Sequence, residues 1–252
     1  KAEAAVTVSS GMLAGKLVMD ELQKDTDCFF SFLATHPAIK NRDSLPFFID
    51  GKLNPRLLDE TVERIVILTD GVPSFETSAV DLSILKEIPN YKEVTLVIDE
   101  SHSLGILGKN GSGIYADLNV PVKRKIMLSS LGKAFGVTGG VIASDLSFIN
   151  RIKSLDTFVS AAGMNPAFVQ TLADAAEIYI SQHQKLIENL QYIDTKLIAN
   201  DTVKFDKTYP LIYLEGEDIN EILKLNHIII AHFKYQENAK DLNRIVVTAN
   251  HT

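Results

Sequence analysis

The chain has 252 residues, of which 46% are hydrophobic and 23% charged, enough apolar material for one large core with or without a small second domain. Its net charge is −7 and its only compact basic run is 123–125, which argues against a nucleic-acid surface. A single cysteine, Cys28, excludes a disulfide framework and a cysteine-rich metal site. Because no membrane-length apolar stretch or secretory signal is visible, we expect a cytoplasmic protein without membrane contact.

The first two-thirds of the chain alternates strand-like and helix-like segments. The chain enters a strand-like run directly after Lys1 and stops soon after another, so we expect further segments beyond both ends. Short runs rich in Val, Ile and Leu predict buried strands at 4–10, 64–70, 94–100, 125–130 and 140–144. Helical periodicity lies between them, at 12–23 and 79–88. This order predicts an α/β fold, with a mostly parallel sheet and helices on both faces.

The remainder of the chain predicts a long helix and a small second domain. Asn165 and Pro166 provide cap and first-turn signals for an amphipathic helix that runs to about Ala199. The residues after it indicate a small α+β unit. We therefore expect a major domain over 1–195 and a small C-terminal domain over 196–252.

Polar side chains follow the carboxyl ends of the predicted strands. Open α/β sheets bind ligands in the crevice outside these ends, so we expect the side chains to meet at one edge. They are Ser10, Asp70 with Ser74 beyond it, Asp99 with His102 after it, and Ser129 with Ser130.

Lys133 stands in the stretch SSLGKAFGVTGG, among small residues that allow the backbone to approach closely. The stretch lacks the other residues of a P-loop, and GSGIYA at 111–116 follows a loop and not a strand, which argues against a dinucleotide fingerprint. Taken singly, Lys133 could be a surface lysine, Asp99 a helix cap and His102 a hydrogen-bonded loop histidine. Pyridoxal phosphate (PLP) chemistry accounts for a lysine, an aspartate and a phosphate cradle together.

The segment VIDESHSLGILGKNGSG at 97–113, followed by SSLGKAFGVTGG, resembles the α-oxoamine synthases, a family of fold-type-I PLP-dependent enzymes. The family includes 8-amino-7-oxononanoate synthase, of biotin biosynthesis, and serine palmitoyltransferase. Ser101 stands where the family usually has alanine. The resemblance runs from AEAAVTVSSG to RIVVTANHT and so covers most of the chain.

The resemblance implies a role for each matching residue. It implies that Lys133 forms the Schiff base with PLP, that Asp99 pairs with the pyridinium nitrogen and that His102 contacts the 3-oxygen of the ring. It implies that His36 stacks on the ring and that Arg244 binds the amino-acid carboxylate. The residues that it implies for the phosphate and for further cofactor contact are Gly11, Met12, Ser74 and Ser130.

The resemblance also implies an activity: condensation of an amino acid with an acyl-CoA thioester and loss of CO2, of the 8-amino-7-oxononanoate synthase type, in a homodimer. Another PLP reaction on the same fold, such as transamination, and a non-catalytic relative are the alternatives. The residues do not indicate which amino acid or acyl group is used.

Overall fold

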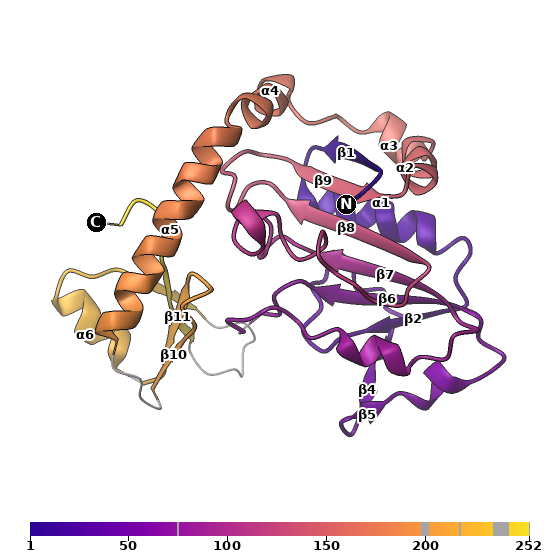
Figure 1. Cartoon of the computed structure of the whole chain (residues 1–252), viewed down its shortest axis with the longest axis horizontal. Helices are drawn as coiled ribbons and strands as arrows, with labels where there is room; N and C mark the ends of the chain where they lie inside the picture. The colour runs from indigo at the N-terminus through magenta and orange to yellow at the C-terminus, as the bar shows by residue number, and fades with distance from the viewer. Residues whose placement is uncertain (75, 198–201, 217, 234–241, 252) are drawn as a thin grey trace. The chain divides into compact units, whose positions relative to one another are not determined.

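The predicted sheet is present in the computed structural model, which describes residues 1–74, 76–197, 202–216, 218–233 and 242–251 (Figure 1). Its strands within these residues are β1 (Ala4–Val8), β2 (Cys28–Ser31), β3 (Leu45–Pro46), β6 (Arg64–Asp70), β7 (Glu93–Asp99), β8 (Arg124–Ser130) and β9 (Gly140–Ser144). Their order across the sheet is β1-β9-β8-β7-β6-β2-β3. The pairs from β8 to β3 are parallel, and β9 pairs antiparallel with both β8 and β1. The α/β prediction with a mostly parallel sheet is confirmed.

Alternation along the strands gives the sheet an apolar layer on each face. In β6, Val66 and Leu68 belong to one apolar cluster, whereas Ile65 and Ile67 belong to the other, because successive side chains point to opposite faces. The first cluster includes residues of α1 (Gly11–Leu22) and α2 (Leu146–Lys153). Each fully buried apolar side chain in these clusters stabilises the folded state by about 1.5–3 kcal/mol relative to an exposed one. These layers fix the strands and therefore the position of their carboxyl ends.

The second cluster is covered by short elements, and the helix predicted over 79–88 is wrong in extent. Only η2 (Ser83–Glu87), a 3-10 helix, forms there. The backbone amide of Val80 bonds to the carbonyl of Gly71, and Ile88 takes an extended conformation before Pro89. The other short elements of the first part of the chain are β4 (Phe48–Ile49), β5 (Lys52–Leu53), η1 (Pro55–Leu58), η3 (Lys109–Gly111) and α3 (Asp156–Ser160).

The single helix predicted from Pro166 to Ala199 consists of two helices, α4 (Pro166–Asp174) and α5 (Ala176–Lys196). Ala175 between them has φ −94° and ψ 13°, outside the α-helical range. One turn earlier, the Thr171 hydroxyl bonds to the Ala167 carbonyl, an arrangement that bends helices. The predicted end at Ala199 lies outside the described residues.

The described structure divides into two compact units, 1–74 with 79–176, and 75–78 with 177–252. The second contains most of α5 and an antiparallel sheet in the order β10-β11-β13-β12. The elements of this unit after α5 are β10 (Val203–Phe205), β11 (Leu211–Leu214), α6 (Ile219–Leu225), β12 (Ala231–Phe233) and β13 (Leu242–Val246). The assignment of 1–195 and 196–252 as domains stays a prediction. Among the described helices, none combines the length and the apolar character needed to cross a bilayer.

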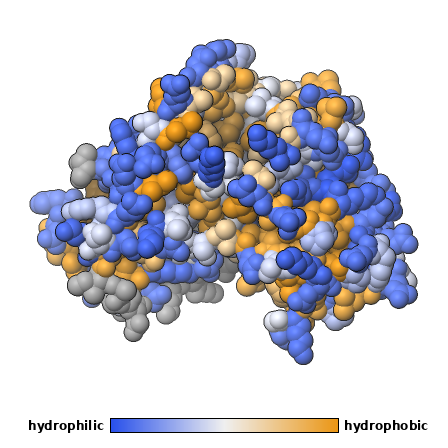
Figure 2. Space-filling model, in the orientation of Figure 1, coloured by the Kyte–Doolittle hydropathy of each residue, from blue (hydrophilic) through white to orange (hydrophobic). Residues whose placement is uncertain are grey.

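Helix α5 carries apolar side chains on its surface. Ile178 and Tyr192 are 62% and 64% exposed, and Ile180 is also exposed, whereas Leu186 and Leu190 are buried. Figure 2 shows apolar atoms among the polar ones over this helix. Its apolar residues therefore do not all lie within the core of its own unit.

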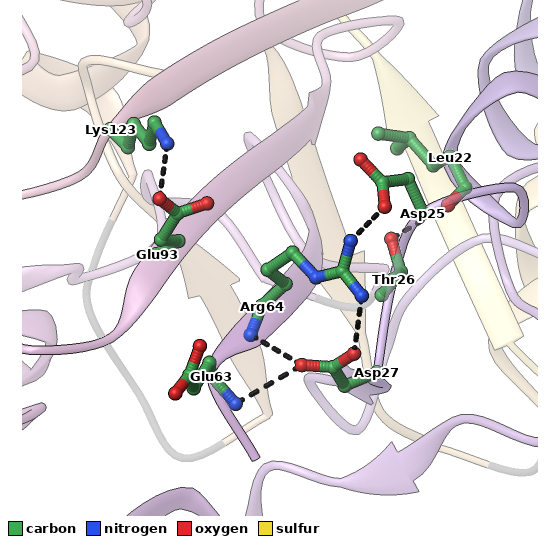
Figure 3. A network of polar contacts seen from close by, with 8 residues as sticks. All are labelled: Leu22, Asp25, Thr26, Asp27, Glu63, Arg64, Glu93 and Lys123. Carbon is green, nitrogen blue, oxygen red and sulfur yellow. Dashed lines mark hydrogen bonds and ion pairs between the residues drawn. The ribbon is translucent and has the colours of Figure 1, made fainter.

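The amino end of β6 is fixed by ion pairs (Figure 3). Arg64 pairs with Asp25 and with Asp27, and the Asp27 carboxylate also accepts the backbone amides of Glu63 and Arg64 at 3.1 and 2.8 Å. Lys123 pairs with Glu93 nearby. Exposed pairs of this kind contribute little individually. They mark the end of the sheet opposite to the candidate active site.

Candidate active site

Two buried carboxylates lie side by side at the carboxyl ends of neighbouring strands. Asp70 ends β6 and Asp99 ends β7, and the two residues are direct partners in the parallel register. Their exposed fractions are 4% and 6%. Burial and the neighbouring carboxylate together disfavour the charged state of Asp70.

The amine of Lys133 lies against His102 at the same edge of the sheet. Lys133 Nζ is 3.0 Å from His102 Nε2, although the two residues are 31 positions apart. Lys133 follows β8 and is exposed, whereas His102 is half-buried in the turn after β7. The exposed lysine is thus accessible to a ligand and is held beside an imidazole, close to the carboxylate pair.

A chain of hydrogen bonds joins the turn after β7 to the turn after β8. The Ser101 amide donates to Asp99 Oδ1 at 2.9 Å, and the Ser130 amide donates to Ser101 Oγ at 2.8 Å. The Gly132 amide in turn donates to Ser130 Oγ at 3.3 Å. Ser101 therefore holds Ser130 at the strand end, a contact that alanine at this position cannot make.

The first turn of α1 lies against the end of β8. Ser10 caps the helix by accepting the Leu13 amide at 3.1 Å, which leaves the Gly11 and Met12 amides at positions that have no acceptor within a helix. A Cβ at Gly11 would lie 2.8 Å from Ser130 Cβ. A Cβ at Gly140 on β9 would lie 2.4 Å from the Ser10 carbonyl oxygen. These glycines bring the helix start up to the strand ends, where its amides and dipole favour an anion.

His36 is linked to this edge through Asp70, a residue for which the resemblance implies no role. The His36 backbone amide donates to Asp70 Oδ1 at 2.9 Å. Burial raises the pKa of the Asp70 carboxyl to about 7, and the charge of Asp99 adds to the increase, whereas the His36 amide and Lys133 oppose it. The signal for Asp70 was its place at a strand end, but its contact with His36 depends on the tertiary structure.

This pKa predicts that Asp70 destabilises the ligand-free fold at neutral and higher pH. Because its folded-state pKa exceeds the ordinary value of 3.8, the folded state binds the proton more tightly, and stability falls from about pH 4 to about pH 7. We expect Asp70→Asn to be more stable than wild type at pH 8, with a gain up to about 3 kcal/mol larger than at pH 5. Urea unfolding at both pH values measures this difference. Asp43→Asn, on an exposed carboxylate, is the control that should show no such change, and an equal gain at both pH values for Asp70→Asn would contradict the assignment.

The buried Glu100 carboxylate shapes the segment after β7. It accepts the Ser103 hydroxyl at 2.7 Å and the amides of Ile114 and Tyr115 at 2.8 and 2.7 Å. Burial raises its pKa, and these hydrogen bonds oppose the increase. Gly113 has φ +76°, and a Cβ there would lie 2.1 Å from Glu100 Oε2. The glycines of GSGIYA thus serve a structural turn.

Two further predicted site residues, Ser74 and Arg244, lie in different units of the chain. Ser74 is half-buried after the turn that follows β6, within the first unit. Arg244 lies on β13 of the second unit, paired with Tyr213 on β11 and Ala231 on β12. Among the described residues, no group of three or more His, Cys, Asp or Glu is arranged to hold a metal ion.

Comparison with known proteins places the chain in a family. The family model of aminotransferases of class I and II matches residues 46–252. The chain therefore belongs to the aminotransferase class I and II family. Within it, the resemblance to α-oxoamine synthases is confirmed by the relatives and the structural neighbours.

A curated relative, 8-amino-7-oxononanoate synthase of Petrotoga mobilis, is 27% identical over 78% of this chain and 54% of its own length, so the chain spans about half of that protein. The 8-amino-7-oxononanoate synthase of Francisella tularensis matches all of the chain and 78% of its own chain, with TM-score 0.70 and 22% identity. A serine palmitoyltransferase of S. paucimobilis, solved with bound PLP and myriocin, matches all of the chain and 69% of its own, with TM-score 0.76 and 16% identity. The solved structures show the fold that this chain shares.

Proposed function

We propose that the chain binds PLP at the carboxyl-end edge of the seven-stranded sheet and that Lys133 Nζ forms the covalent bond to its aldehyde. The observation that carries the proposal is the Lys133 amine 3.0 Å from His102, next to the buried pair Asp70 and Asp99. The donor set fits this cofactor, because it combines an amine, a buried carboxylate for a ring nitrogen and a helix start for a phosphate.

When bound, PLP supplies an aldehyde that captures amino groups and a ring that withdraws electrons from the neighbouring carbon. The chain's residues would hold and orient it. Asp99 would keep the ring nitrogen protonated, His102 would contact the 3-oxygen, and His36 would stack on the ring. The groups proposed for the phosphate and for further contact are the amides of Gly11 and Met12 and the hydroxyls of Ser74 and Ser130.

We propose further that the chain is an acyltransferase of the α-oxoamine synthase type, which condenses an amino acid with an acyl-CoA and releases CO2. Relatives named 8-amino-7-oxononanoate synthase support this reaction and, with it, a place in biotin biosynthesis. Arg244 would bind the substrate carboxylate, because its planar guanidinium matches two carboxylate oxygens. The lysine amine, accessible beside His102, would take up and return the substrate α-proton.

A second candidate function is transamination, which the family name favours. The two are distinguished by thiol release. The chain is incubated with glycine, alanine or serine and with acyl-CoA thioesters of several lengths, and free CoA thiol and CO2 are measured. We expect release of both with at least one pair of substrates. Conversion of an amino acid to its keto acid without thiol release would favour transamination, and neither reaction would favour a non-catalytic relative.

We also propose a homodimer. The exposed apolar side chains of α5, Ile178 and Tyr192 among them, support an apolar contact with a second copy.

A further inference from the structure

Asp70 is a buried titratable group at this edge that has no role in the proposed reaction. It is 4% exposed, and its Oδ1 accepts the backbone amide of a residue 34 positions earlier, His36. Burying a carboxylate beside a second carboxylate is costly, and a neutral side chain at this strand end would avoid the cost. Stability of the fold therefore does not explain an aspartate at position 70, and a functional role is to be sought in the contacts of its side chain.

The turn that carries His36 is mostly held by its own residues. The amides of Ile39 and Lys40 bond to the His36 carbonyl, and the amide of Ala38 bonds to His36 Nδ1 at 3.1 Å. These contacts shape the turn but do not place it against the sheet. Burial of Ile39 in the core and the Phe32 amide, which bonds to the Leu68 carbonyl, anchor the segment. Two side-chain hydrogen bonds to β6 then position His36 itself: the His36 amide donates to Asp70, and the Thr35 hydroxyl donates to the Leu68 carbonyl at 3.0 Å.

We propose that Asp70 is a positioning residue whose side-chain oxygen holds the His36 turn so that the imidazole lies over the bound cofactor ring. The inference rests on the proposed function, since it requires PLP at this edge. Asp70 acts through His36 and does not itself contact the reacting atoms. Asp99 on β7 and Lys133 after β8 are the charged groups that face it, and the hydrogen bond requires only an acceptor oxygen at this position.

The test compares Asp70→Ala, which removes the acceptor, with Asp70→Asn, which keeps an oxygen there and removes the charge. PLP affinity is measured by titration of the visible absorption band, and ring geometry by the circular dichroism of that band. We expect Asp70→Ala to weaken PLP binding by at least ~10-fold and to change the dichroism, and Asp70→Asn to stay within ~3-fold of wild type. Equal losses in both variants would overturn the proposal, because charge and not position would then be the cause.

A double-mutant cycle with His36→Ala separates positioning from a general effect on the fold. His36→Ala keeps the backbone amide but removes the ring, so adding Asp70→Ala should have little further effect on PLP affinity. Independent, additive losses would overturn the proposal. Val66→Ala, a buried truncation on β6 away from the turn, is the control for destabilisation, and we expect it to keep the dichroism of wild type.

The outcomes for the inference and for the proposed function are distinct. If the wild-type chain binds PLP at Lys133 and Asp70→Ala binds it equally well, the inference alone fails. If the wild-type chain does not bind PLP at all, the proposed function fails and the inference fails with it.

Discussion

Replacement of Lys133 by alanine is expected to abolish covalent attachment of PLP and to lower turnover by more than ~1000-fold. The reason is that one amine would serve both as the attachment point and as the group that moves the substrate proton. Lys133 Nζ lies 3.0 Å from His102 Nε2 at the carboxyl-end edge of the sheet, where the cofactor is proposed to bind. The measurement is borohydride reduction of the loaded protein, followed by peptide mapping and a turnover assay.

Lys123→Ala is the matched control, because Lys123 pairs with Glu93 near the opposite end of the sheet. That variant should keep both the covalent label and turnover. A pyridoxyl group mapped to a lysine other than Lys133 would refute the assignment of the attachment site.

The second large effect is expected for Asp99→Asn. The exchange removes the charge but keeps the shape of the side chain and an oxygen that can accept a hydrogen bond from the Ser101 amide. In the wild-type chain this hydrogen bond to Asp99 Oδ1 measures 2.9 Å. A buried carboxylate interacts strongly with a ring nitrogen that carries a proton, because the local dielectric is low. We expect covalent attachment at Lys133 to persist and turnover to fall by at least ~100-fold, since the lost interaction matters most where negative charge develops on the substrate carbon.

Two variants serve as references for this result. His102→Asn should be milder, because His102 would contact the ring oxygen and not the nitrogen. Asp70→Asn makes the same exchange on the paired strand and should retain most activity. If Asp99→Asn turned over at a near-normal rate, Asp99 would be only the acceptor for the Ser101 amide that the structure shows.

The Asp70 carboxylate illustrates how such a site opposes stability. Its raised pKa means that the folded chain is less stable with the carboxylate ionised. We expect Asp70→Asn, although more stable than wild type at pH 8, to bind the cofactor no more tightly than wild type. Asp70 would then combine a cost in stability with a positioning role, as residues at functional sites commonly do.

The sequence by itself determined five of the seven strands of the main sheet, its mostly parallel character and the polar residues at the carboxyl ends of its central strands. It did not indicate β2 and β3, nor that β1 and β9 pair antiparallel. Runs such as 64–70 and 94–100 are rich in Val, Ile and Leu because both faces of these strands are buried, and this pattern can be recognised in the sequence alone. The motif around Lys133 likewise identified a lysine among small residues. Two helix extents were wrong, at 79–88 and at 166–199, because Ile88 is extended before Pro89 and the chain leaves helical geometry at Ala175.

The tertiary structure alone decided which of these residues meet. Neither the spacing between Lys133 and His102 nor that between His36 and Asp70 indicates a contact. The register of β7 with β8 brings the first pair together, and the register of β2 with β6 brings the second pair together, in each case with the turns after these strands. The role of Ser101 as acceptor for the Ser130 amide arises in the same way. Hydrogen bonds between distant segments depend on the order and register of the strands, which the spacing of residues along the sequence does not specify.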